Sequence, residues 1–141
     1  MPLKRISDQR SETIEAFFLQ LSEAQKGSPG EDSGQSMLEL IKRLNEFFYH
    51  ETIWCLTSHN QLVLLENDSW HSPWYVMITC VYSREFHIEY RMPDGFKPWE
   101  DALVMGMANS LHRAIEYILI AMRNSGGWQH SAAMNFSAHW Q

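Results

Sequence analysis

Cysteine is scarce in this sequence, and the common metal-binding and redox spacings are missing. The two cysteines, Cys55 and Cys80, lie in separate apolar runs and form no CxxC pair. None of the seven histidines belongs to an HExxH sequence or to a zinc-ligand spacing. A cysteine in an apolar run usually packs as a small buried hydrophobic residue. We therefore predict no metal site and no cofactor.

Long apolar runs and long basic runs are also missing. No stretch approaches the roughly 20 apolar residues that a membrane-spanning helix needs, and Asp8, Glu12 and Glu15 interrupt any N-terminal signal-peptide region. The basic runs are no longer than pairs, such as Lys4 with Arg5, whereas a nucleic-acid binder shows a basic face. We therefore expect a cytoplasmic protein that binds neither membranes nor nucleic acids directly.

The charge balance is acidic. Lysine and arginine total 11, aspartate and glutamate total 17, and the formal charge at pH 7 is -6. Such an excess favours solubility and also attracts partners with a basic surface. Composition leaves the oligomeric state open.

The chain is long enough for one domain with a sizeable core. It has 141 residues, of which 45% are hydrophobic and 13% aromatic. We expect a single domain over residues 1–141, with loose tails at 1–10 and 128–141. Residues 27–35 read Gly-Ser-Pro-Gly-Glu-Asp-Ser-Gly-Gln and predict a flexible linker, so that the preceding helix could pack on the core or swap to a neighbouring chain.

Apolar residues at helical spacing predict three helices. The first covers residues 12–25, and its apolar stripe is Ile14, Phe17, Phe18 and Leu21. The second covers residues 36–50 and begins with a capping box of Ser36 and Glu39. The third begins near Pro98 or Trp99 and extends to about residue 124, with an apolar stripe over 103–122.

Four segments between the second and third helices have the composition of strands. They are residues 52–57, 61–66, 74–82 and 85–92, and turn residues separate them. Strands grouped together in this way indicate the α+β class. The predicted fold is a four-stranded antiparallel sheet of two hairpins packed against two or three helices, in the order α-α-β-β-β-β-α, with the second and third helices covering one face.

Three arrangements of residues could supply enzymatic chemistry. Cys80 would lie opposite His87 if the last hairpin had a two-residue turn, and His87 with Glu89 could form an acid–base pair. A cavity between sheet and helix could also use His87, Glu89, Tyr90 and Arg91 to bind a small ligand. Cys80 lies in an apolar strand, however, and residues two apart on a strand usually form only a polar face. The sequence therefore favours a protein that is not an enzyme, with no catalytic residues.

Two segments have the composition of a protein-binding surface. Residues 66–74 join two strands and combine acidic residues with two tryptophans and a histidine, and residues 96–101 form a second aromatic and acidic cluster. Alternatively, the tryptophans of the first segment fold back onto the sheet, and the second segment anchors the start of a helix. The predicted partner-binding residues are Glu66, Asp68, Trp70, His71, Trp74, Glu85, Asp94 and Trp99.

The order of elements over residues 36–128 resembles the small immunity proteins of bacterial contact-dependent toxin systems. The resemblance lies in a capped helix, two hairpins, a long helix with its stripe from Leu103 to Met122, and the closing Gly126-Gly127-Trp128. It implies a cytosolic protein that occludes the active site of a cognate toxin domain, often a nuclease. Two other classes stay open: a small-ligand-binding or enzymatic α+β domain, and a homo-oligomeric adaptor or chaperone.

Overall fold

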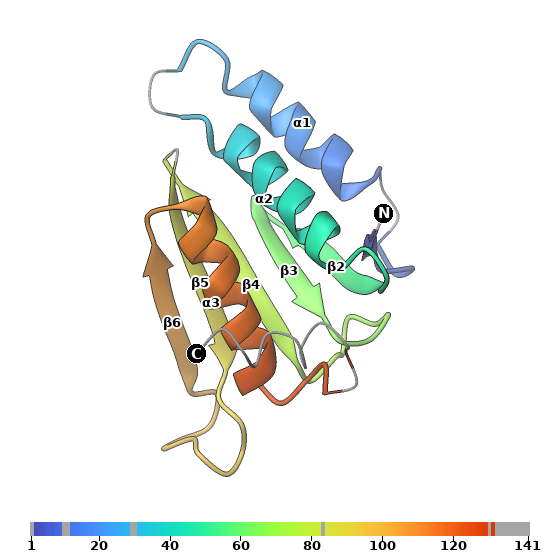
Figure 1. Cartoon of the computed structure of the whole chain (residues 1–141), viewed down its shortest axis with the longest axis vertical. Coiled ribbons are helices and arrows are strands. Elements are labelled where there is room, and N and C mark those ends of the chain that lie inside the picture. The colour runs from blue at the N-terminus through green and yellow to red at the C-terminus, as the bar shows by residue number, and fades with distance from the viewer. Residues whose placement is uncertain (1, 10–11, 29–30, 83, 130, 132–141) are drawn as a thin grey trace.

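The computed structural model describes residues 2–9, 12–28, 31–82, 84–129 and 131. The fold is α+β, with three helices and one six-stranded mixed sheet whose strands are ordered β1-β2-β3-β4-β5-β6 (Figure 1). β1 pairs parallel to β2, and all other neighbours are antiparallel. The elements in chain order are β1 (Leu3–Arg5), α1 (Ile14–Ala24), α2 (Ser33–Phe47), β2 (Ile53–Ser58), β3 (Gln61–Leu65), β4 (Tyr75–Val81), β5 (Glu85–Arg91), β6 (Leu103–Ala108) and α3 (Leu111–Asn124).

The α+β class is confirmed, whereas the expected four-stranded sheet is wrong because two further strands flank it. β1 lies in the segment expected to be a loose tail. Its Leu3 is buried in the core, and the amide of Leu3 donates to Oδ1 of Asn45 in α2 at 2.9 Å. The amide of Ile6, just past the strand, donates to the carbonyl of Cys55 at 2.8 Å. Burial of Leu3 and Ile6 therefore holds this short polar segment against β2.

The other added strand is β6, in a segment expected to belong to the last helix. That helix begins at Leu111, where Ser110 caps it by accepting from the amide of Arg113. Asp101 has φ of 58°, a left-handed conformation that a right-handed helix does not contain. From Leu103 the chain pairs with β5 along its full length. Leucine, methionine and alanine favour helices, but the open edge of β5 supplies hydrogen bonds that override this local preference.

The first two helices form a tightly connected pair, and the segment between them is shorter than expected. α2 begins at Ser33, so residues 33–35 are helical and Ser36 lies inside the helix instead of capping it. The side chain of Gln25, at the end of α1, accepts from the amide of Gly34 at 2.9 Å and donates to the hydroxyl of Ser33 at 2.8 Å. One glutamine thus closes α1 and caps α2, and it ties the two helices together.

The helices cover one face of the sheet. α2 and α3 lie against it, and α1 lies on the outer side of α2 (Figure 1). On the opposite face, a smaller cluster is buried beside β2 and β3, formed by Ile6, Leu56, Val63 and Leu65. Trp128, in the segment expected to be a loose tail, is buried in the main core, whereas residues 130 and 132–141 lie outside the described residues.

Candidate functional site

The two segments singled out in the sequence meet at one end of the sheet. Leu65 at the end of β3 pairs with Tyr75 at the start of β4, and Arg91 at the end of β5 pairs with Leu103 at the start of β6. The β3–β4 and β5–β6 connections therefore emerge side by side. We call residues 66–74 and 91–101 the loop end. It contains all but one of the predicted partner-binding residues, and the exception is Glu85.

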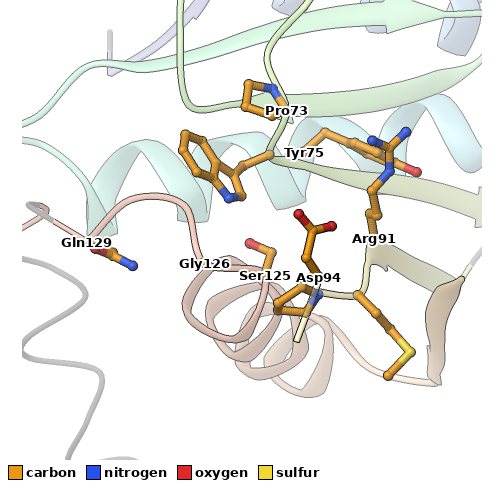
Figure 2. A pocket seen from close by; sticks show the side chains of 10 residues that line it. Pro73, Tyr75, Arg91, Asp94, Ser125, Gly126 and Gln129 are labelled. Atoms are coloured by element: carbon orange, nitrogen blue, oxygen red, sulfur yellow. The ribbon is translucent and has the colours of Figure 1, made fainter. Parts of the chain in front are cut away.

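A cleft of about 380 Å³ lies where these two connections meet the chain that follows α3. Figure 2 shows Asp94 pointing toward the segment that carries Pro73 and Tyr75, with Arg91 extending alongside Tyr75. Arg91 lies over the Tyr75 ring, 5.9 Å from its centroid. The remaining lining residues are Trp74, Met92, Pro93, Ser125, Gly126 and Gln129.

Trp74 forms one wall of this cleft, and two glycines fix its position. A Cβ atom at Gly127 would lie 2.7 Å from Cβ of Trp74, and one at Gly126 would lie 3.3 Å from its indole nitrogen. Gly126 also has φ of 98°, which favours glycine. The chain after α3 can therefore approach the indole closely. The alternative that this tryptophan folds back onto the body of the protein holds in part, since Trp74 lies against both glycines yet is 38% exposed.

The loop end carries an excess of negative charge. Residues 66–74 and 91–101 together contain five carboxylates and two cationic side chains. Lys97 lies 3.0 Å from Glu100 and 3.1 Å from Asp94, and these two hydrogen bonds raise the pKa of Lys97, with Glu100 as the larger cause. Arg91 lies 3.7 Å from Asp101. Both cations are already paired with carboxylates, so this end of the sheet has a net negative charge.

Asp68 has a structural contact that the sequence did not suggest. Its carboxylate accepts from both the amide and the hydroxyl of Ser7, each at 2.6 Å, and so holds the segment after β1. The amide of Trp70 donates to Asp8 at 3.5 Å, while the indole of Trp70 is 52% exposed. Glu66 is half-buried and His71 is exposed. Within this segment, Trp70 is therefore the side chain best placed to contact a partner.

The Ser7 contact predicts a pH dependence of stability. The hydrogen bonds from Ser7 lower the pKa of Asp68, and the hydroxyl has a larger effect than the amide. A carboxyl whose pKa is lower in the folded state stabilises the fold above its unfolded pKa, and this contribution is lost as pH falls through the folded pKa. The difference in melting temperature between the wild type and Asp68→Asn should therefore shrink as pH falls from 6 to 2. A difference that stays constant over this range would show that the carboxylate has no such role.

The 96–101 segment is exposed and anchors no helix. The helix that it was expected to anchor begins ten residues after it, and the rings of Phe96 and Trp99 are 77% and 72% exposed. The anchoring alternative is therefore wrong. Sequence reasoning also missed three exposed apolar side chains of β6, namely Leu103, Met105 and Met107. Their alternation with half-buried or small residues was the available signal, but Leu103 and Met107 also fit a helical stripe.

Glu85 does not belong to the loop end. It pairs with Val81 beside the β4–β5 turn, at the opposite end of the sheet. Its carboxylate lies 3.0 Å from Nε2 of His87. The remaining predicted partner-binding residues can touch one partner together, whereas Glu85 would need a partner that spans the whole sheet.

Two of the three candidate arrangements for enzymatic chemistry are not assembled. In the third, His87 and Glu89 share one face of β5, and the side-chain contact of His87 is with Glu85. Thr79, not Cys80, pairs with His87, so the expected pairing of Cys80 with His87 is wrong by one residue. Neighbouring residues on a strand point to opposite faces, so Cys80 lies on the helix side and His87 on the other. Burial raises the pKa of the Cys80 thiol to about 11 and that of Cys55 to about 12, so both stay protonated at neutral pH.

The four residues expected to line a ligand cavity between sheet and helix also lie on different faces of the sheet. Tyr90 lies on the helix side, whereas His87, Glu89 and Arg91 alternate with it and lie on the opposite face. The four side chains therefore cannot line one cavity. In the ranges that the structure describes, no three histidine, cysteine, aspartate or glutamate side chains gather as a metal ion would require. The helices of the described part are all too short or too polar to span a bilayer.

Comparison of the chain with protein-family models, with curated proteins and with solved structures finds no match.

Proposed function

We propose that this protein is a non-catalytic binding protein that neutralises a cognate protein toxin by covering its active or substrate-binding site. The observation that carries the proposal is the loop end, where large aromatic rings are exposed beside an excess of carboxylates. Phe96 and Trp99 are each more than two-thirds exposed, next to Glu100 and Asp101. Exposed aromatic anchors of this kind dominate the affinity of many protein interfaces.

The charge of the loop end suggests the chemistry of the partner. An enzyme that acts on nucleic acid must present a basic cleft to the phosphate backbone. Carboxylates can occupy such a cleft in place of phosphates, while the aromatic rings bury apolar area at its rim. A nuclease toxin fits this description, and a protein that protects against it would act in the cytoplasm. The partner in this proposal is thus a basic protein surface and not the nucleic acid itself.

The test begins with capture of the partner from the native host on the tagged full-length chain. The captured protein is then purified and its activity titrated with the wild-type chain. The proposal expects the activity to be lost at a fixed stoichiometry. A captured partner whose activity is unaffected by a saturating amount of the chain would contradict it.

Variants of the loop end test the surface itself. Trp99→Ala should weaken the complex by about 2 kcal/mol, or about 30-fold in Kd, because it removes a central anchor. Trp70→Ala should also weaken it. Leu19→Ala is the matched control, since Leu19 is as exposed as Trp70 but lies on α1, away from the loop end. If both tryptophan variants are folded and bind as tightly as the Leu19→Ala variant, the loop end is not the binding surface.

A further inference from the structure

The two edges of the sheet differ in how they are protected. β1 is three residues long, contains Lys4 and Arg5, and is followed by Gln9, whose side-chain amide bonds both backbone groups of Thr57 in β2. Short length and charge are the usual protection of an edge strand. β6 is six residues long and contains no charged residue and no proline. Within the described residues, no strand pairs with its outer edge.

The hydrogen-bond pattern identifies the unpaired backbone groups of β6. The amide of Met92 donates to the carbonyl of Ala102 at 2.9 Å. In an antiparallel ladder the residues alternate, so the even-numbered residues from 102 to 108 direct their backbone groups toward β5. The odd-numbered residues of the strand direct their amides and carbonyls toward the free edge. They are Leu103, Met105 and Met107.

The same three residues carry the exposed apolar side chains of β6. Their side chains lie on the face away from the helices, and Met105 is the most exposed at 62%. On the helix side of the edge, Tyr117 of α3 lies over Gly106, where a Cβ atom would be 3.3 Å from its ring. Ile120, three residues along the same flank of α3, is also exposed. Apolar surface therefore borders the free edge on both faces.

The size of this edge suits a weak dimer. Six residues at about 3.3 Å each give a contact about 20 Å long, and the strand and helix layers together are about 20 Å deep. The contact covers on the order of 400 Å² of each copy, or about 800 Å² in total before side-chain relief is counted, which is below the roughly 1,000–1,200 Å² at which stable specific interfaces begin. We therefore expect a transient dimer with a dissociation constant on the order of 100 μM.

We propose that β6 pairs antiparallel with β6 of a second copy of this chain, with Met105 opposite Met105 on a two-fold axis. In this register Leu103 of each copy lies opposite Met107 of the other. All three residues then exchange backbone hydrogen bonds, and their apolar side chains lie next to one another. The two sheets become one continuous sheet, and the two α3 helices lie side by side.

The acidic charge of the chain does not prevent this pairing. On the flank of α3 that borders the edge, Arg113 and Glu116 carry one charge of each sign. A further charged row lies on β5, and the two β5 strands would be three strand spacings apart, or about 14 Å. This distance exceeds the Debye length of about 8 Å at physiological ionic strength, so the repulsion between the rows is largely screened. The strand itself brings no charge to the contact. A second copy therefore matches the edge in hydrogen bonding, in shape and in polarity, and this inference does not depend on the proposed function.

The first experiment measures molecular mass by sedimentation between about 1 and 300 μM, a range that brackets the expected dissociation constant. The wild-type mass should rise from that of one chain toward that of two. Met105→Lys should raise the dissociation constant at least tenfold, because it places two ammonium groups opposite each other. Leu19→Lys is the control, since it makes the same charge change at a similarly exposed site on α1 and should leave the dimer intact. A wild-type chain that stays monomeric throughout this range overturns the proposal.

The second experiment tests the register by NMR amide exchange at low and high concentration. The amides of Leu103, Met105 and Met107 should become protected as concentration rises, whereas those of Val104 and Gly106, already bonded to β5, should be protected at both. Dimers whose odd-numbered β6 amides stay unprotected would form through another surface and would equally overturn the proposal.

Discussion

Replacing Phe18 with alanine is expected to lower the free energy of unfolding by about 3–5 kcal/mol. Phe18 lies on α1, yet its side chain is 0% exposed and belongs to the main core. Its ring meets that of Phe17 edge to face, with the centroids 5.0 Å apart. Removing it leaves a cavity between α1 and the rest of the core, and the surrounding backbone relaxes only in part. Urea unfolding followed by circular dichroism measures the loss.

The neighbouring residue provides the control for this prediction. Leu19 does not belong to the core and is 52% exposed, so Leu19→Ala should change the free energy of unfolding by less than about 1 kcal/mol. If Phe18→Ala also lowers the free energy of unfolding by less than about 1 kcal/mol, α1 contributes little to the stability of the fold and does not pack against α2 as the structure has it.

Replacing Gly34 with alanine is expected to destabilise the protein by about 2 kcal/mol, or about 5–10 °C in melting temperature. A Cβ atom at this position would lie 2.5 Å from the amide nitrogen of Ser22 and 2.9 Å from the carbonyl oxygen of Phe18. Both neighbours are backbone atoms, which cannot rotate away, so α1 must move off α2. The gain of about 1 kcal/mol that alanine usually brings inside a helix is smaller than this cost.

Gly95 is the matched control for Gly34. It lies in an exposed turn of the 92–102 connection, and no atom lies within 4 Å of the Cβ position. Gly95→Ala should therefore change stability by less than about 1 kcal/mol, and a small gain is possible because alanine restricts the unfolded chain. Differential scanning calorimetry of the two variants compares them directly. Equal melting temperatures for Gly34→Ala and the wild type would show that the helices are farther apart than the structure has them.

The same contacts show how α1 stabilises the fold although it lies away from the loop end. The helix does not touch the loop end, but it buries Phe18 and closes onto α2 through Gly34 and Gln25. α2 in turn packs against the sheet whose strands position the loop-end connections. Variants of α1 should therefore affect partner binding only through folding, which makes the exposed Leu19 a suitable control in each assay.

The sequence was informative wherever local pattern and final environment agreed. The stripe of Ile14 and Phe18 predicted α1, and the hairpins from residue 53 to residue 91 were predicted within one or two residues of their observed ends. In these segments the period of the apolar residues matches the side that is buried. The capping box predicted at Ser36 is wrong, since α2 begins three residues earlier, at Ser33. There the side chain of Gln25, at the end of α1, accepts from the amide of Gly34.

The candidate site was predicted in its parts but not in its assembly. Residues 66–74 and 96–101 were both recognised by their aromatic and acidic composition, but strand register alone brings them to the same end. Register also separated Glu85 from them and placed Cys80 and His87 on opposite faces. The exposure of Trp99 could not be read from its neighbours in sequence, because burial of an aromatic ring depends on what packs against it.

By itself, the amino-acid sequence determined the α+β class, the acidic charge and the identity of most helices and strands, because these follow from composition and local periodicity. The tertiary structure alone decided that β1 and β6 are strands, since neither forms without the hydrogen bonds of a neighbouring strand. It also decided which apolar residues stay exposed, at the loop end and along β6. Those surfaces depend on contacts between segments distant in the sequence, which no local pattern encodes.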